Sequence, residues 1–389
     1  MRRDLILIAL AMFTWGLGEG LFIYFQPLYL QALGANPITI GTILGAMGVA
    51  MTIAHIPAGY LADKFGRRPI LWASWFLGMV ATWIMALGNT LPVFIVGMLM
   101  YGLTSFVMSP LNSYITTARG KFTVQRAITL ISAAYNLGAI SGPWVGGAIG
   151  DRVGLRPVYL VSALVFVASN LVIYFIRPQP IDIPHSETKQ KGLPWNRQYV
   201  GFLGIVFLAM FATYLPQPLS SNFLQNERGL TFSQIGRLGS MASLGIVVLN
   251  LILGYLDSRL GFIISQAAVG LFALLLWQGT GTIWFALGYF LLGGYRVARS
   301  LATAQARNLV HQANMGLAYG VTETVGSFAV IVAPLLAGYL YQQEPTQIYS
   351  YSFGLIILSL LLSARFAPRH KTDPVMQDSL YNPKKENLA

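Results

Sequence analysis

The chain has 389 residues, of which 55% are hydrophobic and only 10% are charged. A typical soluble domain carries about 25% charged residues, so this composition excludes a soluble globular protein and indicates an integral membrane protein. The formal net charge is +12, and the absence of cysteine excludes disulfides and thiolate metal sites.

Long apolar runs follow one another along the whole chain. Each is long enough for a transmembrane helix, which needs about 20 mainly apolar residues, and none shows the ten-residue alternation of a transmembrane β-strand. The runs cover residues 5–33, 38–62, 69–88, 91–117, 127–149, 157–176, 199–219, 232–256, 262–280, 282–306, 315–341 and 348–366. The sequence therefore predicts an all-α integral membrane protein with twelve transmembrane helices.

The basic residues are divided unequally between the two sides of these spans. If successive spans alternate in direction, 19 of the 25 Lys and Arg lie on the side that holds both termini, and only 4 lie on the other side. The positive-inside rule then places both termini in the cytoplasm. The basic patches are expected to face anionic lipid headgroups of the plasma (inner) membrane rather than nucleic acid.

A polar segment, residues 177–197, divides the spans into six and six, and the two halves repeat one another. The matching positions are Gly41 with Gly236 and Gly59 with Gly254, 195 residues apart, and Pro143 with Pro334 and Gly147 with Gly338, 191 residues apart. Repeated six-helix units are typical of secondary transporters, whose substrate site lies between the repeats. The alternative is a chance match between glycine-rich segments.

These boundaries define the expected domains. Residues 1–177 form an N-terminal six-helix bundle and residues 178–197 a cytoplasmic linker, while residues 198–367 form a C-terminal six-helix bundle and residues 368–389 a cytoplasmic tail. The two bundles are expected to be related by pseudo-symmetry.

One charged, glycine-marked loop lies between the second and third spans. Its pattern consists of Gly59, Asp63, Gly66, Arg67 and Arg68, and it resembles the loop motif of the major facilitator superfamily. Together with the twelve spans and the 6+6 repeat, the resemblance covers nearly the whole chain. It implies two bundles that rock about a central cavity, and a cytoplasmic latch in which the acidic residue meets a helix N-terminus of the other half. The alternative is a solvated turn that obeys the positive-inside rule.

The fifth span carries a second motif. Its members are Gly138, Gly142, Pro143, Gly146 and Gly147. Small residues let helix backbones approach closely, and a proline bends a helix. The pattern resembles a motif of the drug and proton antiporter branch, where this face seals the two halves on the outer side. That branch carries an intramembrane arginine in the fourth span, whereas residues 91–117 contain no charge here.

Four charged residues lie deep inside predicted spans, away from the span ends: Glu19, Arg296, Arg299 and Glu323. Each costs about 2.5 to 3.5 kcal/mol at mid-membrane, so each needs a partner or a function. Arg299 and Glu323 lie about 10 and 12 Å from their helix ends, which predicts a mutual salt bridge. The family resemblance places Arg296 on the cavity, where its guanidinium is expected to hold a substrate carboxylate or phosphate.

Glu19 is the candidate proton site, because a carboxyl whose surroundings alternate between two states can load and release a proton. The alternative is a permanently protonated acid in a helix–helix hydrogen bond. Trp15, Phe22 and Gln26 share the helical face of Glu19 and are expected to face the cavity. Tyr135, Asn136 and Tyr214 are further candidates for its lining.

The sequence contains no nucleotide-binding loop and no catalytic or metal-ligating motif, so we predict no enzyme, no cofactor and no metal site. A channel and a lipid-modifying enzyme are the alternative classes. The predicted function is proton-coupled efflux of a small amphipathic organic molecule by alternating access, carried out by a single chain in contact with membrane lipids. The alternative transport function is proton-coupled import of a small organic anion held by Arg296 and Arg299.

Overall fold

The computed structural model describes residues 3–179, 197–310 and 315–367, and these residues form helices without any strand. The first half comprises α1 (Arg3–Phe22), η1 (Ile23–Phe25), α2 (Gln26–Ala32), α3 (Pro37–Phe65), α4 (Arg67–Leu87), α5 (Leu91–Leu103), η2 (Thr104–Val107), α6 (Met108–Ala118), α7 (Val124–Val153) and α8 (Leu155–Tyr174). The second half comprises α9 (Arg197–Tyr214), α10 (Ser220–Asn226), α11 (Phe232–Leu253), α12 (Ser258–Gln278), α13 (Thr282–Leu292), α14 (Gly294–Ala306), η3 (Arg307–Leu309), α15 (Met315–Gln343) and α16 (Gln347–Phe366). Most of the predicted linker and the predicted tail lie outside the described residues.

The predicted all-helical membrane fold is confirmed. Among the described residues, nine helical segments are individually long and apolar enough to cross a membrane, and a tenth span consists of α5 to α6 with a bend of 41°. The other two are α7, whose 30 residues are rich in glycine and polar side chains, and the α13–α14 pair, which carries Arg296 and Arg299. Helix α7 is long enough but polar, whereas α13 and α14 have 11 and 13 residues and reach the length of a span only together.

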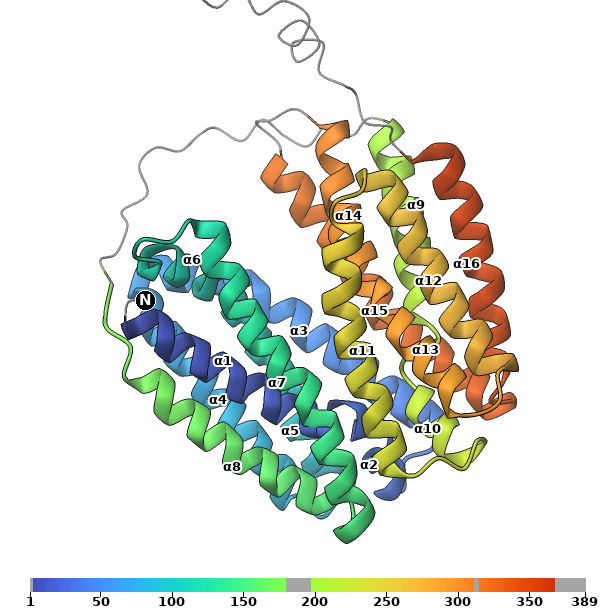
Figure 1. Cartoon of the computed structure of the whole chain (residues 1–389), viewed down its shortest axis with the longest axis horizontal. Helices are drawn as coiled ribbons and strands as arrows, with labels where there is room; N and C mark the ends of the chain where they lie inside the picture. The colour runs from blue at the N-terminus through green and yellow to red at the C-terminus, as the bar shows by residue number, and fades with distance from the viewer. Residues whose placement is uncertain (1–2, 180–196, 311–314, 368–389) are drawn as a thin grey trace, which may run out of the picture.

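The two halves meet at one end of the molecule. In Figure 1 the blue-to-green half and the yellow-to-red half lie close together where α2 and α10 are found, and they diverge toward the end that holds α6 and α14. Two seams join them, because α7 packs on α11 and α3 packs on α15. The chain has therefore adopted a conformation in which the halves are in contact at the end that holds α2 and α10.

The sequence repeat reappears in these seams as a pair of equivalent contacts. A β-carbon added at Gly236 of α11 would overlap the carbonyl oxygen of Pro143 in α7. A β-carbon added at Gly41 of α3 would overlap the carbonyl oxygen of Pro334 in α15 in the same way. The repeated glycines and prolines are thus the places where the backbones of the two halves touch, which excludes a chance match.

A reciprocal amide pair links the halves between the two seams. Gln31 Nε2 donates to Asn226 Oδ1 at 3.2 Å, and Asn226 Nδ2 donates to Gln31 Oε1 at 3.1 Å. The two residues are 195 positions apart, the same offset as the repeated glycines. Equivalent positions that bond to each other lie at the pseudo-twofold axis, so this pair marks the axis at the closed end.

Two helical hairpins turn on single glycines. Gly66 joins α3 to α4 with a φ of 85°, and Gly154 joins α7 to α8 with a φ of 84°. Their ψ values of 158° and 172° place both residues in a backbone region that is essentially restricted to glycine. The conformation of the chain therefore accounts for Gly66 in the first motif without any functional role.

Candidate substrate and proton site

The carboxyl group of Glu19 in α1 lies beside two tyrosines of its own half. Tyr135 Oη of α7 donates a hydrogen bond to Glu19 Oε2 at 2.9 Å. The buried hydroxyl of Tyr101 lies near the same carboxyl and has no hydrogen-bond partner within the described residues. The structure thus brings together Glu19 and Tyr135, which the sequence proposed separately.

Glycines of the second motif create this arrangement by letting α1 and α7 touch. A β-carbon at Gly138 would overlap the backbone of Phe13, and one at Gly16 would overlap the backbone of Tyr135. Gly142 and Gly146 also contact α1, whereas Gly147 and Pro143 contact α11 across the seam. The motif therefore has two faces: one packs α1 inside the first half, and only the other joins the halves.

Arg296 of α14 faces the region between the halves. Its side chain is exposed and makes no hydrogen bond or ion pair within the described part of the chain. Its positive charge acts on Glu19 and Tyr135 in the opposite half, as well as on Tyr214 and Tyr295 in its own half. A carboxyl from one half and a guanidinium from the other therefore share one electrostatic environment.

The predicted partnership of Arg299 and Glu323 is present. Arg299 Nε donates to Glu323 Oε2 at 2.8 Å, while the second carboxylate oxygen accepts a hydrogen bond of 2.8 Å from Thr303. A second guanidinium nitrogen donates to Ser327 at 3.0 Å. Arg299 is bonded to two residues of α15 and is therefore not free to bind a substrate anion together with Arg296. This differs from the predicted anion site, in which both arginines hold the anion.

Three predicted cavity residues are buried by their packing. Trp15 and Phe22 are buried in the first half, with exposed fractions of 7% and 0%, and Trp15 packs edge-on against Trp75 at 4.9 Å between ring centroids. Gln26 is also buried and starts a new helix after the 3₁₀ turn η1, which breaks the regular face assumed for this span. In this conformation these side chains pack between helices, as large aromatic surfaces do, and Trp15 also lies beside the Glu19 carboxyl. Their place on a substrate cavity stays a prediction.

The other two predicted cavity-lining residues, Asn136 and Tyr214, have different contacts. The amide of Asn136 donates to the Ser132 carbonyl oxygen on its own helix at 2.8 Å. The ring of Tyr214 lies 5.3 Å from that of Tyr295, measured between centroids, and near the positive charge of Arg296. Tyr214 thus belongs to the group around Arg296, whereas Asn136 satisfies its own backbone.

Sequence reasoning missed several polar groups of this region, namely Tyr24, Tyr101, Tyr295 and Ser327. Ser327 lies four residues after Glu323, so helical spacing could have identified it as a neighbour on the same face. The tyrosines carried no such signal, because their positions follow from how different helices pack.

The described part of the first motif makes contacts inside its own half. Arg67 donates to Thr117 at 2.8 Å and to Gln179 at 3.2 Å, and the guanidinium of Arg68 lies 3.9 Å from the ring centroid of Trp72. The side chains of Gly59 and Asp63 lie outside the described residues. A latch between the halves remains a prediction.

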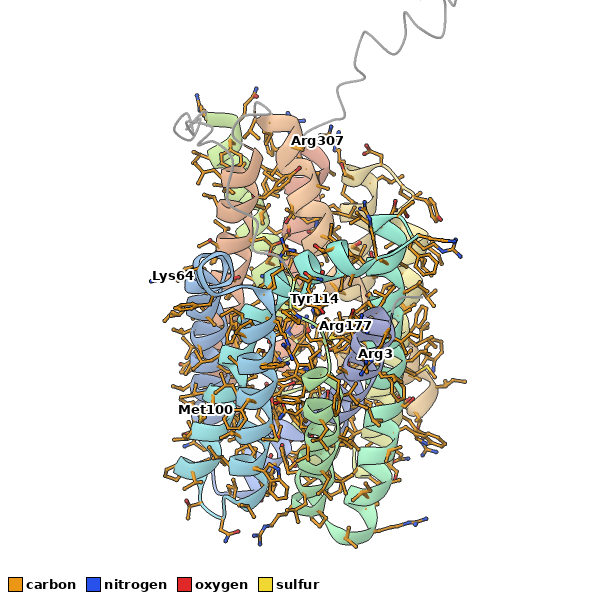
Figure 2. All side chains as sticks on the ribbon, turned by 90° about the vertical axis from the view of Figure 1, so that its left-hand side faces the viewer. Arg3, Lys64, Met100, Tyr114, Arg177 and Arg307 are labelled. Carbon is orange, nitrogen blue, oxygen red and sulfur yellow. The ribbon has the colours of Figure 1, made fainter. Side chains whose placement is uncertain are left out.

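Residues 177–179, which precede or begin the predicted linker, form hydrogen bonds in the region around Arg67. Tyr114 Oη of α6 donates to the carbonyl oxygen of Arg177 at 2.7 Å, and the two residues lie together in Figure 2. Gln179 returns a hydrogen bond of 3.0 Å to the Tyr114 carbonyl oxygen, and the Arg177 amide donates to Asp4 of α1 at 3.1 Å. The contacts of Arg67 with Gln179 therefore connect the motif loop to the beginning of the linker.

Comparison with known proteins identifies the family. The family model described as Major Facilitator Superfamily matches residues 8–204 and 202–380. The chain is 24% identical over 382 residues to Multidrug resistance protein 2 of Bacillus subtilis (strain 168), covering 93% of this chain and 95% of that protein. It is 23% identical over 357 residues to Quinolone resistance protein NorA of Staphylococcus aureus (strain MSSA476), covering 88% of this chain and 90% of the other.

Solved structures show the same fold at low sequence identity. The nucleoside transporter NupG superposes with a TM-score of 0.79 at 16% identity, covering 94% of this chain and 98% of that chain. A D-xylose-proton symporter superposes with a TM-score of 0.71 at 13% identity, covering 94% of this chain and 97% of the other. With its own family match over nearly all of its length, the chain belongs to the major facilitator superfamily and is a multi-pass membrane transporter.

Proposed function

We propose that this transporter exports a small amphipathic organic molecule in exchange for protons, by alternating access and as a single chain. The positive-inside rule supports an orientation in the plasma (inner) membrane with both termini in the cytoplasm. In that orientation the seams α7–α11 and α3–α15 close the outer end, and the structure corresponds to the inward-facing state. The names of the relatives, multidrug and quinolone resistance proteins, support export.

The arrangement of Glu19 and Arg296 on opposite halves carries this proposal. Glu19 is held by Tyr135 inside the first half, while the charge of Arg296 reaches it from the second half. Any rocking of the halves changes the distance between this carboxyl and this guanidinium. A proton site whose electrostatic surroundings change with conformation is what coupling of proton movement to alternating access requires.

The surroundings of this pair favour a substrate with an aromatic or apolar body. Tyr24 and Tyr214 lie near Arg296 and offer ring surfaces with hydroxyl groups at their edges. Aromatic side chains recognise varied organic molecules through ring packing, with a few polar groups to orient them. We therefore infer that apolar contacts provide most of the binding energy.

One observation supports a second candidate function, the import of a small organic anion. Arg296 is exposed and has no ion-pair partner within the described residues. A free guanidinium can bind a carboxylate or phosphate through two parallel hydrogen bonds. The anion would be held by Arg296 alone, because Arg299 is engaged with Glu323.

Arg296→Ala separates these two functions. If the substrate is an anion, transport of organic anions falls to the level of protein-free liposomes, while neutral amphiphiles give the same result for variant and wild type. If the substrate is a neutral amphiphile, its transport persists in the variant with an altered pH dependence, because the charge acting on Glu19 is lost. The measurement is substrate flux in proteoliposomes under an imposed pH gradient, with an internal pH-sensitive dye.

The matched control for this experiment is Arg237→Ala. Arg237 is an exposed arginine on α11, and within the described residues it makes no ion pair with Glu19. The Arg237→Ala variant loses the same charge at a position outside the candidate site, so its substrate flux should match that of the wild type. Equal loss of anion and amphiphile transport in Arg296→Ala alone would show that this arginine has a structural role.

A further inference from the structure

A carboxylate joins the two halves at the closed end. Asp151, in the last turn of α7, accepts hydrogen bonds from the backbone N–H groups of Phe232 at 2.8 Å and Ser233 at 3.0 Å, one with each carboxylate oxygen. Phe232 and Ser233 are the first two residues of α11. The first N–H groups of a helix have no partner inside that helix and carry a partial positive charge, so Asp151 caps α11 from the opposite half.

The cap on α11 is divided between the halves. Thr231 accepts a hydrogen bond from the N–H of Gln234, and the Gln234 side chain bonds back to Thr231, which forms a capping box. Asp151 supplies acceptors for the two intervening N–H groups. Separation of the halves would leave the capping box intact and would expose the two backbone N–H groups that Asp151 satisfies.

The equivalent seam has no such contact. The position 191 residues after Asp151 is Gln342 on α15, and the positions 195 residues before Phe232 and Ser233 are Pro37 and Ile38 on α3. Pro37 has no N–H to donate, and the N-terminus of α3 is capped by its own neighbour, Asn36, at 2.8 Å. The two seams therefore share their glycine contacts, but only the α7–α11 seam carries the carboxylate.

Asp151 stays charged over the physiological pH range. Partial burial opposes ionisation, but hydrogen bonds from Ser233, Thr231 and Phe232 outweigh it and hold the pKa of Asp151 below its usual value. A carboxylate with a lowered pKa stabilises the bound state above its unperturbed pKa of about 3.9, and this contribution is lost only as the pH falls through the lowered value. The contact is therefore insensitive to pH between 5 and 8.

The charged groups near this end do not alter that conclusion. They are Arg152 and Arg156 on the first half, and Glu227, Arg228, Arg237 and Glu344 on the second half. Arg228 donates to the carbonyl oxygens of Leu276 and Trp277 at 3.2 and 2.9 Å. Within the described residues, none of the four arginines forms an ion pair with Asp151.

We propose that Asp151 is the clasp of the outer gate, a residue that favours the closed outer end by capping α11 across the seam, and that it does not carry the transported proton. This inference rests on the proposed alternating-access function. It assigns two tasks to two carboxyl groups: Asp151 sets how stable the closed outer end is, whereas Glu19 makes the cycle respond to pH. Neither α7 nor α11 needs to bend for the clasp to release, since the contact lies at the helix ends.

Asp151→Ala tests the clasp directly. Loss of a helix cap should shift the ratio of open to closed outer ends toward open by on the order of fivefold, and by the same factor at pH 8 and pH 6. The chain has no cysteine, so Arg156→Cys and Glu227→Cys introduce two unique thiols for spin labels on exposed residues at the outer ends of the two halves. Electron–electron distance measurements in lipid nanodiscs then give the populations of both states.

Three further variants keep the test specific. Gln342→Ala, at the equivalent position of the other seam, should leave the distance distribution unchanged. Asp151→Asn retains one acceptor oxygen and should give an intermediate shift, and Asp151→Glu should restore much of the closed population. Thermal unfolding of each variant, followed by circular dichroism, should show melting temperatures close to that of the wild type, because the clasp acts between states that are both folded.

The outcomes separate this inference from the proposed function. Equal distance distributions for Asp151→Ala and wild type would overturn the clasp, and a shift that appears only at low pH would show that Asp151 is instead a proton site. If Asp151→Ala opens the outer end but no proton movement accompanies any substrate in wild-type proteoliposomes, the clasp stands and proton coupling fails. If proton-coupled flux is present and the distances do not move, the function stands and the clasp fails.

Discussion

Glu19→Gln is expected to abolish transport driven by a pH gradient while leaving the protein folded. Glutamine matches the size of glutamate and keeps an oxygen that can accept the hydrogen bond from Tyr135. It cannot gain or release a proton, so it removes the coupling step without leaving a cavity. In proteoliposomes with an imposed pH gradient, net flux should fall to that of protein-free vesicles.

Substrate exchange at equal pH gives the companion measurement. Exchange of labelled for unlabelled substrate needs the halves to rock but needs no net proton movement, so Glu19→Gln should retain it. Glu344→Gln serves as the matched control, because this acid is exposed near the end of α15 and its side chain accepts a hydrogen bond from Thr346. Flux in Glu19→Gln that keeps the full pH-gradient dependence of the wild type would remove Glu19 as the proton site.

The sequence predicted those features that depend on repetition and on local composition. Gly41 and Gly236 were linked by their spacing alone, and both prove to be contact points between the halves. The partnership of Arg299 and Glu323 followed from equal depth, since two opposite charges inside a membrane lower their energy by meeting. Such arguments succeed because the bilayer restricts where a charge or a glycine contact is tolerated.

The features that the sequence did not predict depend on packing between distant segments. Trp15 and Glu19 share a helical face, yet the ring is buried among aromatic side chains while the carboxyl meets Tyr135. The periodicity of a sequence shows which residues share one face of a helix. It does not show which residues of other helices that face contacts. Asp151 illustrates the same limit, because its partners lie 81 and 82 residues away on another half and no local pattern connects them.

Gly236→Ala is expected to open the outer end more strongly than any change at the clasp. The added β-carbon would overlap the carbonyl oxygen of Pro143, and a backbone atom in a packed helix cannot move aside as a flexible side chain can. The variant should therefore disfavour the state in which α7 and α11 touch and reduce transport for substrates of every class. Spin labels at Arg156→Cys and Glu227→Cys should report a longer distance across the outer end.

Alanine normally stabilises the interior of a helix by about 1 kcal/mol relative to glycine. A loss of function in Gly236→Ala therefore cannot come from a lower helix propensity. Gly236→Ala should thus lose transport and closure without losing helical structure. Gly41→Ala should behave alike, since it meets Pro334 in the equivalent seam, whereas Gly320→Ala has no atom within 4 Å of its new β-carbon and should transport as the wild type does. If Gly236→Ala and Gly320→Ala gave the same distances and the same flux, close backbone contact at the seam would not be what holds the outer end closed.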